Sequence, residues 1–294
     1  MVVRGYVRQS AGTVSLDDAE RRALILAHPA FDGATQTTST LLAAFTILEP
    51  GDKARPHRHT AAAIRFATAA EGAVTMVNGR RCAMAEGDLI LTPPMCWHGH
   101  INESSRRTVW FDAANMPLLC GLDANFFEPG SGRANDFWQG DEGEEALWEE
   151  AGLIAEGASH EGAHSPKYRY AGAATRRLLA RTPPRPDGAR WVRYVDPATG
   201  GPVMPTLDCH AVRLTAGSAT RPRRVTWNQI CLVVSGAGRS RIGGHDFRWS
   251  RHDVFTVPHW SWTTHQAESG DADLFVVSDR AMFERLNLVR DELE

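Results

Sequence analysis

Residues 51–59 read GDKARPHRH, which places two histidines, His57 and His59, two positions apart after a proline. On a β-strand, residues two apart project from the same face, so both imidazole rings would point in one direction. A second stretch, WHGHIN, holds another pair with the same spacing, His98 and His100. Imidazole nitrogens are common ligands of transition metals. The spacing predicts a metal site on neighbouring strands, with His98 as the third ligand and His100 as the alternative.

The sequence around these histidines is typical of β-sheet. Short apolar runs alternate with Gly, Pro and Asn; the runs cover residues 43–48, 73–77, 89–91 and 108–111. Residues 77–80 read VNGR, and Asn and Gly both tolerate the positive φ of a type I′ hairpin turn. These features predict an all-β fold.

The strand-rich texture occurs twice in the chain. Residues of the first block recur in the second at a nearly constant offset, which one single-residue indel reconciles: Pro56 with Pro222 and Gly72 with Gly238 at 166, then Gly79 with Gly244, Pro93 with Pro258 and Trp97 with Trp262 at 165. An internal repeat of this kind decides the architecture. We therefore predict a duplicated all-β unit.

Helical patterns flank and separate the two blocks. Ser15, followed three residues later by Asp18, is typical of a helix start, and apolar residues continue the pattern to Ala27. Further helices are expected at 144–156, 175–181 and 280–294. The predicted organisation is an N-terminal helical arm (1–40), a metal-binding all-β unit (41–128), a helical linker segment (129–190), a second all-β unit (191–279) and a C-terminal helix (280–294).

Composition narrows the function classes. Lys plus Arg number 32 and Asp plus Glu 35, a net charge of −3, which argues against nucleic-acid partners and an anionic membrane surface. No apolar run approaches the roughly 20 residues needed to span a bilayer, and residues 1–10 lack the apolar core of a secretory signal. Five widely spaced cysteines with no Cys-x-x-Cys pair fit reduced cytosolic thiols. We expect a cytoplasmic protein.

Two longer motifs resemble a known family. The pattern Gly-x5-His-x-His followed by Gly-x5-Pro-x4-His-x3-Asn is the two-part cupin signature, carried here by Gly51, His57, His59, Gly87, Pro93, His98 and Asn102. The chain thus resembles a bicupin. HRHT at 57–60, WHGH at 97–100 and DPATGGPVMPT at 196–206 more narrowly resemble the gentisate and salicylate 1,2-dioxygenases. The resemblance implies two β-barrel (jelly-roll) cupin domains in tandem with short accessory helices.

The same resemblance implies a chemistry. It makes His57, His59 and His98 the ligands of Fe(II), while Arg65 and His100 bind the carboxylate and hydroxyl region of a small aromatic acid and Asp112 orients them. Many cupins carry a ligand Glu shortly after the second histidine, but this chain has Ala63 and Ile64 there. Three neutral imidazoles leave the full metal charge to attract a chelating carboxylate and phenolate. The implied reaction is cleavage by O2 between the carboxyl- and hydroxyl-bearing ring carbons.

The second block departs from the first at the ligands. By the repeat offsets, Arg223, Val225 and Thr263 stand where the first block has His57, His59 and His98. We expect one metal per chain and a structural second barrel, which packs on its partner or forms the interface of a homo-oligomer, a dimer or tetramer.

Substrate identity is the least constrained expectation. Gentisate enzymes of the family commonly carry Trp and Gln where this chain has Leu42 and Thr46, and a polar residue where it has Ala61. The smaller side chains favour a substituted salicylate or a hydroxynaphthoate beside gentisate and salicylate. Two other classes stay open: a metal-dependent isomerase or hydrolase cupin, and a non-enzymatic cupin that binds a phenolic acid.

Overall fold

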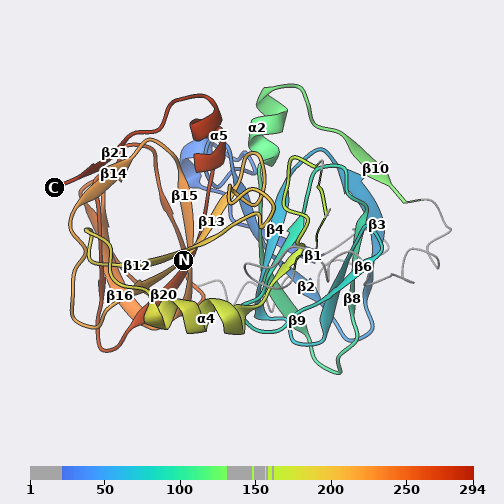
Figure 1. Cartoon of the computed structure of the whole chain (residues 1–294), viewed down its shortest axis with the longest axis horizontal. Helices are drawn as coiled ribbons and strands as arrows, with labels where there is room; N and C mark the ends of the chain where they lie inside the picture. Colours follow the sequence, from blue (N-terminus) through green and yellow to red (C-terminus); the bar gives the residue numbers. More distant parts are fainter. Residues whose placement is uncertain (1–21, 131–147, 149–155, 157, 161) are drawn as a thin grey trace.

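The computed structural model describes residues 22–130, 148, 156, 158–160 and 162–294. Within these residues the strands form four sheets, which pair into two β-barrels lying side by side (Figure 1). The first barrel, coloured blue to green, lies on the right of the view, and the second, orange to red, on the left. The tandem β-barrel arrangement agrees with the fold predicted from the sequence.

The first barrel is built from two facing antiparallel sheets. One sheet has the strand order β1 (Arg22–Ile25), β2 (Leu42–Leu48), β9 (Thr108–Ala114), β4 (Ala63–Ala69), β7 (Leu89–Thr92) and β11 (Arg169–Tyr170). The other has the order β10 (Phe127–Pro129), β3 (Lys53–His59), β8 (His98–Asn102), β5 (Ala73–Val77) and β6 (Arg80–Ala83).

The second barrel repeats this plan. One sheet has the order β12 (Arg190–Tyr194), β13 (Asp208–Leu214), β20 (Ala272–Ser278), β15 (Gln229–Ser235) and β18 (Val254–Val257). The other has the order β17 (His245–Ser250), β16 (Ala237–Ile242), β19 (Thr263–Ala267), β14 (Arg223–Val225) and β21 (Asp291–Leu293). The described helical elements are η1 (Pro29–Phe31), α2 (Met116–Gly121), α4 (Gly172–Arg181) and α5 (Arg280–Arg285).

The strand register of the two barrels matches the sequence repeat. His57 pairs with His98 between β3 and β8, and Arg223 pairs with Thr263 between β14 and β19, as the offsets require. The hairpin between β5 and β6 also agrees with prediction, because its turn residues Asn78 and Gly79 both have positive φ, 47° and 81°. The repeat in the sequence therefore corresponds to a repeat in the structure.

The two barrels share a continuous apolar core. Side chains alternate along β4, so Ile64 and Phe66 pack outward with residues of the second barrel, whereas Ala67 belongs to the core inside the first. Phe66 stacks on Phe275 of β20 with ring centroids 4.3 Å apart and an interplanar angle of 25°. The sheets that contain β4 and β20 thus face each other across the junction.

The first predicted helix is wrong where the structure describes it. Residues 22–25 form β1, which pairs with β2 in the register Arg22 to Ile47. Ser15 and Asp18, where that helix would begin, lie outside the described residues. The apolar spacing suits a helix locally, but the unpaired edge of β2 provides backbone hydrogen bonds that local sequence does not reveal.

The other helices agree in part. The predicted segment 144–156 falls almost wholly outside the described residues. Helix α4 includes the segment predicted at 175–181 and connects β11 of the first barrel to β12 of the second, along the lower edge of the view (Figure 1). Helix α5 is shorter than predicted, because Asn287 turns the chain with φ 57° and residues 291–293 add a strand beside β14. None of the described helices is long and apolar enough to cross a membrane.

Candidate metal centre

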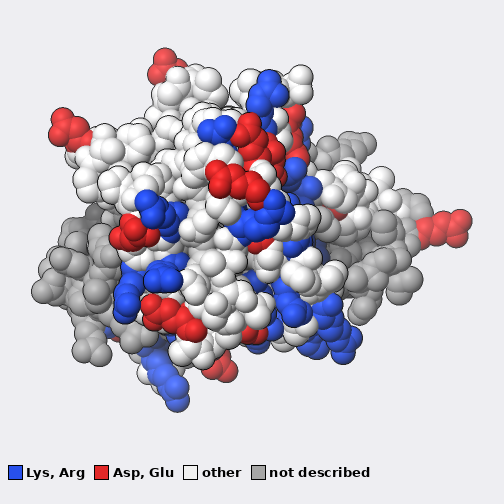
Figure 2. Space-filling model, turned by 90° about the vertical axis from the view of Figure 1, so that its left-hand side faces the viewer, with Lys and Arg blue, Asp and Glu red and all other residues white. Residues whose placement is uncertain are grey.

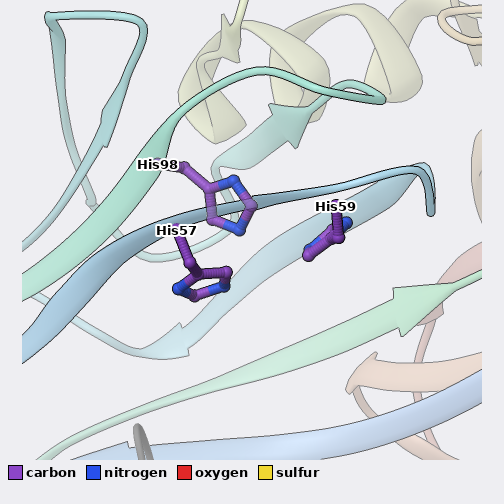
Figure 3. A group of neighbouring side chains, drawn as sticks. All are labelled: His57, His59 and His98. Atoms are coloured by element: carbon purple, nitrogen blue, oxygen red, sulfur yellow. The ribbon is translucent and has the colours of Figure 1, made fainter. Parts of the chain in front are cut away.

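Three histidines converge inside the first barrel. His57 and His59 extend from β3, and His98 extends from the neighbouring strand β8. One nitrogen of each ring lies within 4.8 Å of the other two, and all three residues are buried (Figure 3). Two come from one strand face and the third from the directly paired position, so the sheet register itself builds the group.

Backbone carbonyl groups fix the orientation of these rings. A carbonyl oxygen only accepts hydrogen bonds, so each Nδ1 that contacts one must carry the proton and donate. The three contacts are His57 Nδ1 to Arg55 O at 3.0 Å, His59 Nδ1 to Ala61 O at 2.8 Å and His98 Nδ1 to Cys96 O at 3.0 Å. In each ring Nε2 is then the nitrogen with the available lone pair, as a metal ligand requires.

The chemistry of this donor set fits a transition metal ion. Nε2 of His98 is buried and makes no hydrogen bond. Burial first, then the nearby charge of Arg65 and the other histidines, holds the pKa of His98 well below its usual range. Burying a polar atom without a partner costs free energy. A neutral imidazole whose buried lone pair faces two other imidazoles is therefore suited to bind a metal ion. Three nitrogen ligands leave further coordination positions for small molecules.

Arg65 enters the same interior from the opposite sheet. It lies on β4, is 1% exposed, and forms an ion pair through Nε with Oδ1 of Asp112 at 3.5 Å. Its Nη1 donates to Oγ1 of Thr92. Arg65 lies on β4 and the histidines lie on β3 and β8, and these strands belong to the two facing sheets of the same barrel.

Asp112 is held in place by several donors besides Arg65. Trp110 Nε1 donates to Oδ1 at 3.0 Å, and the hydroxyl of Thr46 donates to Oδ2. Thr46 on β2 is one of the positions at which the sequence suggested a difference from gentisate enzymes, and it contacts the carboxylate that orients Arg65. The carboxylate therefore joins β9, β4 and β2 in one partly buried network.

His100 occupies a separate position on β8. It is 1% exposed, its Nδ1 lies 2.9 Å from the hydroxyl of Thr75, and its ring centroid is 5.3 Å from Trp110. The ring lies 6.0 Å from that of His98, outside the converging group. Its place beside the group and inside the barrel gives it access to a ligand without making it part of the three-nitrogen set.

Strand β10 adds an aromatic side chain that sequence reasoning missed. Phe127 stacks on the ring of His57 with centroids 5.2 Å apart and an interplanar angle of 28°, and 46% of it is exposed. It reaches this position because β10 pairs with β3, opposite His59. The only local signal was the apolar pair Phe126 and Phe127 just beyond the first barrel.

The second barrel keeps one member of this interior. His265 stands at the position of His100, and its Nδ1 lies 2.7 Å from the hydroxyl of Ser240, which stands at the position of Thr75. At the three ligand positions it has Arg223, Val225 and Thr263. The described residues thus contain two equivalent interiors with different chemistry.

The relatives of this chain, found by sequence and by structure, are cupin proteins named as 1,2-dioxygenases. The family model described as "Cupin domain" matches residues 44–114. The gentisate 1,2 dioxygenase 1 of Aquipseudomonas alcaligenes is 31% identical over 294 residues, covering 99% of this chain and 84% of that protein. The 5-aminosalicylate 1,2-dioxygenase of a Comamonas species is 34% identical over 281 residues, covering 93% of this chain and 74% of that protein. The crystal structure of salicylate 1,2-dioxygenase from Pseudoaminobacter salicylatoxidans with gentisate superposes with a TM-score of 0.93 and 35% identity, covering 99% of this chain and 82% of that one.

Proposed function

Since this chain belongs to the bicupin family of gentisate and salicylate 1,2-dioxygenases, we propose that it is an Fe(II)-dependent enzyme that opens the ring of a carboxylated phenol with O2. Cleavage falls between the carboxyl- and hydroxyl-bearing carbons. The observation that carries the proposal is the buried guanidinium of Arg65 inside the same barrel as the three histidines. A fixed cation beside a metal site suits a substrate with a carboxylate next to a metal-chelating hydroxyl.

In this proposal His57, His59 and His98 hold the iron through Nε2. When bound, iron supplies the electron transfer between the aromatic ring and O2 that side chains alone lack. The backbone contacts at Nδ1 keep the three rings in the ligating tautomer throughout turnover. The protein contributes the binding, orientation and proton handling described next.

Arg65 is the group that binds the substrate carboxylate. Guanidinium and carboxylate groups match in a planar, two-contact geometry, which fixes the position of the ring as well as its charge. Asp112 and Thr92 hold the guanidinium from the side, so little conformational entropy is lost when the substrate arrives. The buried setting strengthens the attraction, since little water screens it.

His100 handles the proton of the substrate hydroxyl. Thr75 fixes its ring through Nδ1, so Nε2 is the atom assigned to the hydroxyl side of the substrate. An ortho hydroxyl must lose its proton to chelate a metal well, and an imidazole nitrogen is a suitable group to accept it. Asp112 acts by orienting Arg65 and not by contacting the ring.

The substrate class follows from the walls of the barrel. Salicylate, a substituted salicylate, gentisate and hydroxynaphthoate all carry the required carboxylate and ortho hydroxyl. Leu42, Thr46 and Ala61 are small where gentisate enzymes commonly carry larger or more polar groups, and Phe127 offers an apolar face at the exposed side. These features favour a ring with bulk away from the carboxylate. We further propose a cytoplasmic homo-oligomer, a dimer or tetramer.

Oxygen consumption tests this function directly. Protein loaded anaerobically with Fe(II) is mixed with each of the four substrate types while dissolved O2 and the ultraviolet spectrum of the ring-opened product are followed. One O2 consumed per substrate establishes the dioxygenase and identifies the substrate. The variant Arg65→Gln should bind the same amount of iron with much lower kcat/KM. Substrate conversion without O2 uptake would support the isomerase or hydrolase class, and binding without conversion the phenolic-acid-binding cupin.

A further inference from the structure

The second barrel contains a cavity of about 280 Å³ that the proposed chemistry does not use. Four arginines from separate parts of the chain line it, together with two tryptophans: Arg185, Arg193, Arg223, Arg280, Trp191 and Trp227. Arg223 also lines a smaller interior cavity of about 40 Å³ that reaches His265. Since Arg223 stands at the position of His57, this cavity opens beside the second-barrel counterpart of the metal centre.

The arginines and tryptophans alternate in space. Trp191 has the guanidinium carbons of Arg185 and Arg223 each 5.3 Å from its ring centroid. Trp227 has those of Arg223 and Arg280 at 5.9 Å and 5.4 Å. Guanidinium groups within about 6 Å of an aromatic face are attracted to it and lie with restricted orientation. The cavity wall is therefore a preorganised series of flat cations and flat aromatic rings.

Carboxylates neutralise part of this charge, and most of them lie behind the wall. Asp208 is fully buried and accepts from Arg193 at 2.9 Å and from Arg280 at 3.1 Å. Asp291, which does line the cavity, pairs with Arg223 at 2.7 Å. Among the described residues Arg185 forms no ion pair, and it is exposed at the rim.

The remaining lining groups are uncharged donors and acceptors. Gln229 and Ser278 contribute amide and hydroxyl groups, and His210 completes the wall. Burial lowers the pKa of His210 to about 4, so this ring is neutral at physiological pH. Glu284 pairs with Arg193 and Arg280, and Asp187 lies 3.9 Å from Arg223, so Arg185 is the lining arginine that these carboxylates leave to a ligand.

From this geometry we propose that the second barrel binds a small aromatic carboxylate in the cavity that these arginines and tryptophans line. Guanidinium groups recognise a carboxylate through paired hydrogen bonds, and the flat guanidinium plane also stacks on an aromatic ring, as these arginines already do on Trp191 and Trp227. The volume lies just below the roughly 300–1,000 Å³ typical of ligand pockets, which suits a single-ring acid. This site does not depend on the metal centre or on its reaction.

The surface charge of the second barrel favours a small ligand over a polyanion. Figure 2 shows the side of the molecule formed by this barrel, where Lys and Arg are interspersed with Asp and Glu. Ion pairs such as Arg248 with Glu268 and Arg241 with Asp246 belong to its strands. A nucleic acid would need a continuous basic surface, which this face does not present.

Calorimetric titration with benzoate tests the proposal. Benzoate has the carboxylate and the ring but lacks the ortho hydroxyl needed to chelate a metal. We expect benzoate to bind the wild-type protein and Arg185→Gln to weaken binding about tenfold, the loss of roughly one charged hydrogen bond. The matched control Arg248→Gln removes an exposed arginine of the same barrel outside the cavity and should bind normally. Trp191→Leu should also weaken binding, by removing the ring that Arg185 and Arg223 flank.

Three results would overturn the proposal, and none of them resembles failure of the proposed reaction. Absence of benzoate binding, or binding that Arg65→Gln abolishes and Arg185→Gln leaves intact, would remove the second site. Inorganic phosphate that competes as strongly as benzoate would show a general anion site with no contribution from the aromatic ring. Arg185→Gln should leave saturated O2 uptake unchanged, so loss of binding and loss of turnover are read separately.

Discussion

The Nε2 atom of His98 is the most informative single atom in the first barrel, because it is buried, unbonded and aimed at two other imidazoles. We predict that His98→Ala loses its metal on dialysis, since two imidazoles hold a divalent ion far more weakly than three. His100→Ala is the matched control, because it removes an imidazole from the same strand and face and should keep its metal. Elemental analysis of both variants decides. Full metal in His98→Ala with loss in His100→Ala would reverse the two assignments.

Arg65 carries the second prediction at this scale. Arg65→Gln should lower kcat/KM by about 10- to 150-fold, because the Gln amide can keep one of the two contacts to the carboxylate and the loss of the other, charged hydrogen bond costs roughly 1.5–3 kcal/mol. Thr92→Val keeps the guanidinium and removes only its hydroxyl neighbour, so it should lose much less. Steady-state kinetics on the best substrate compares the two. An unchanged kcat/KM in Arg65→Gln would place the carboxylate of the substrate elsewhere.

Among the elements, α4 is positioned by a glycine contact. Gly172 begins the helix, donates its N–H to the buried Asp88 at 2.8 Å, and a Cβ there would lie 2.4 Å from the backbone carbon of Gly87. Gly172→Ala should therefore lower the free energy of unfolding by about 1–3 kcal/mol through overpacking. In Gly121→Ala, the control in helix α2, the new methyl group meets nothing within 4 Å. Urea denaturation measures the free energy of unfolding of both variants. Equal losses would show that the backbone near Gly172 shifts to accommodate the methyl group without cost.

Strand periodicity explains why the histidines were predictable. His57 and His59 share a face by their spacing alone, and His98 belongs to a motif of the same period. Thr75 and Thr92 were not predictable, because each matters through a partner on another strand. Pairing register depends on the whole sheet, and the local sequence of a threonine carries no trace of it.

The same limit explains the first segment of the described chain. Ala23, Leu24 and Leu26 fit a helical stripe, yet residues 22–25 pair with β2. A short strand has little intrinsic preference, and the open edge of β2 decides its conformation. Periodicity and the repeat therefore predicted a duplicated all-β unit with a group of histidines, and the family resemblance implied the barrels, while strand neighbours at the edges required the structure.

At the scale of the whole molecule, the two barrels should unfold together. Phe275 of the second barrel stacks on Phe66 and also contacts Phe111 and Tyr194. We predict that Phe275→Ala lowers the free energy of unfolding by about 3–5 kcal/mol, and that metal loss and strand melting still coincide. Calorimetry with a metal-release readout tests this. Two separate transitions would mean that the barrels are independent units.

Acid should destabilise the second barrel. Burial lowers the pKa of His210 and of His265 to about 4, from an ordinary value of 6.5. The unfolded chain then binds more protons than the folded one between these values, so stability rises with pH across that window. For each of the two histidines, the free energy of unfolding should be about 2 kcal/mol lower at pH 5 than at pH 7.5.

The variant His265→Gln isolates this contribution. Its unfolding free energy should fall less steeply than that of the wild type between pH 7 and pH 4.5, measured by urea denaturation at each pH. Both proteins have the same three candidate metal ligands, so the pH dependence that those histidines contribute cancels in the comparison. Parallel curves would show that His265 keeps the same proton affinity in the folded and unfolded states.

The alternation of β4 has a practical meaning for anyone who wishes to redesign this enzyme. One face of the strand carries Arg65 and the other carries Phe66, so mutations at its buried positions disturb either the chemistry or the packing between the barrels. The short edge strand β10 is different, because Phe127 touches the metal centre while almost half of it faces outward. Mutant libraries that seek new ring specificities should vary β10 and leave β4 unchanged. The second barrel lacks the three histidines, but it should be kept intact because the outer face of β4 packs against it.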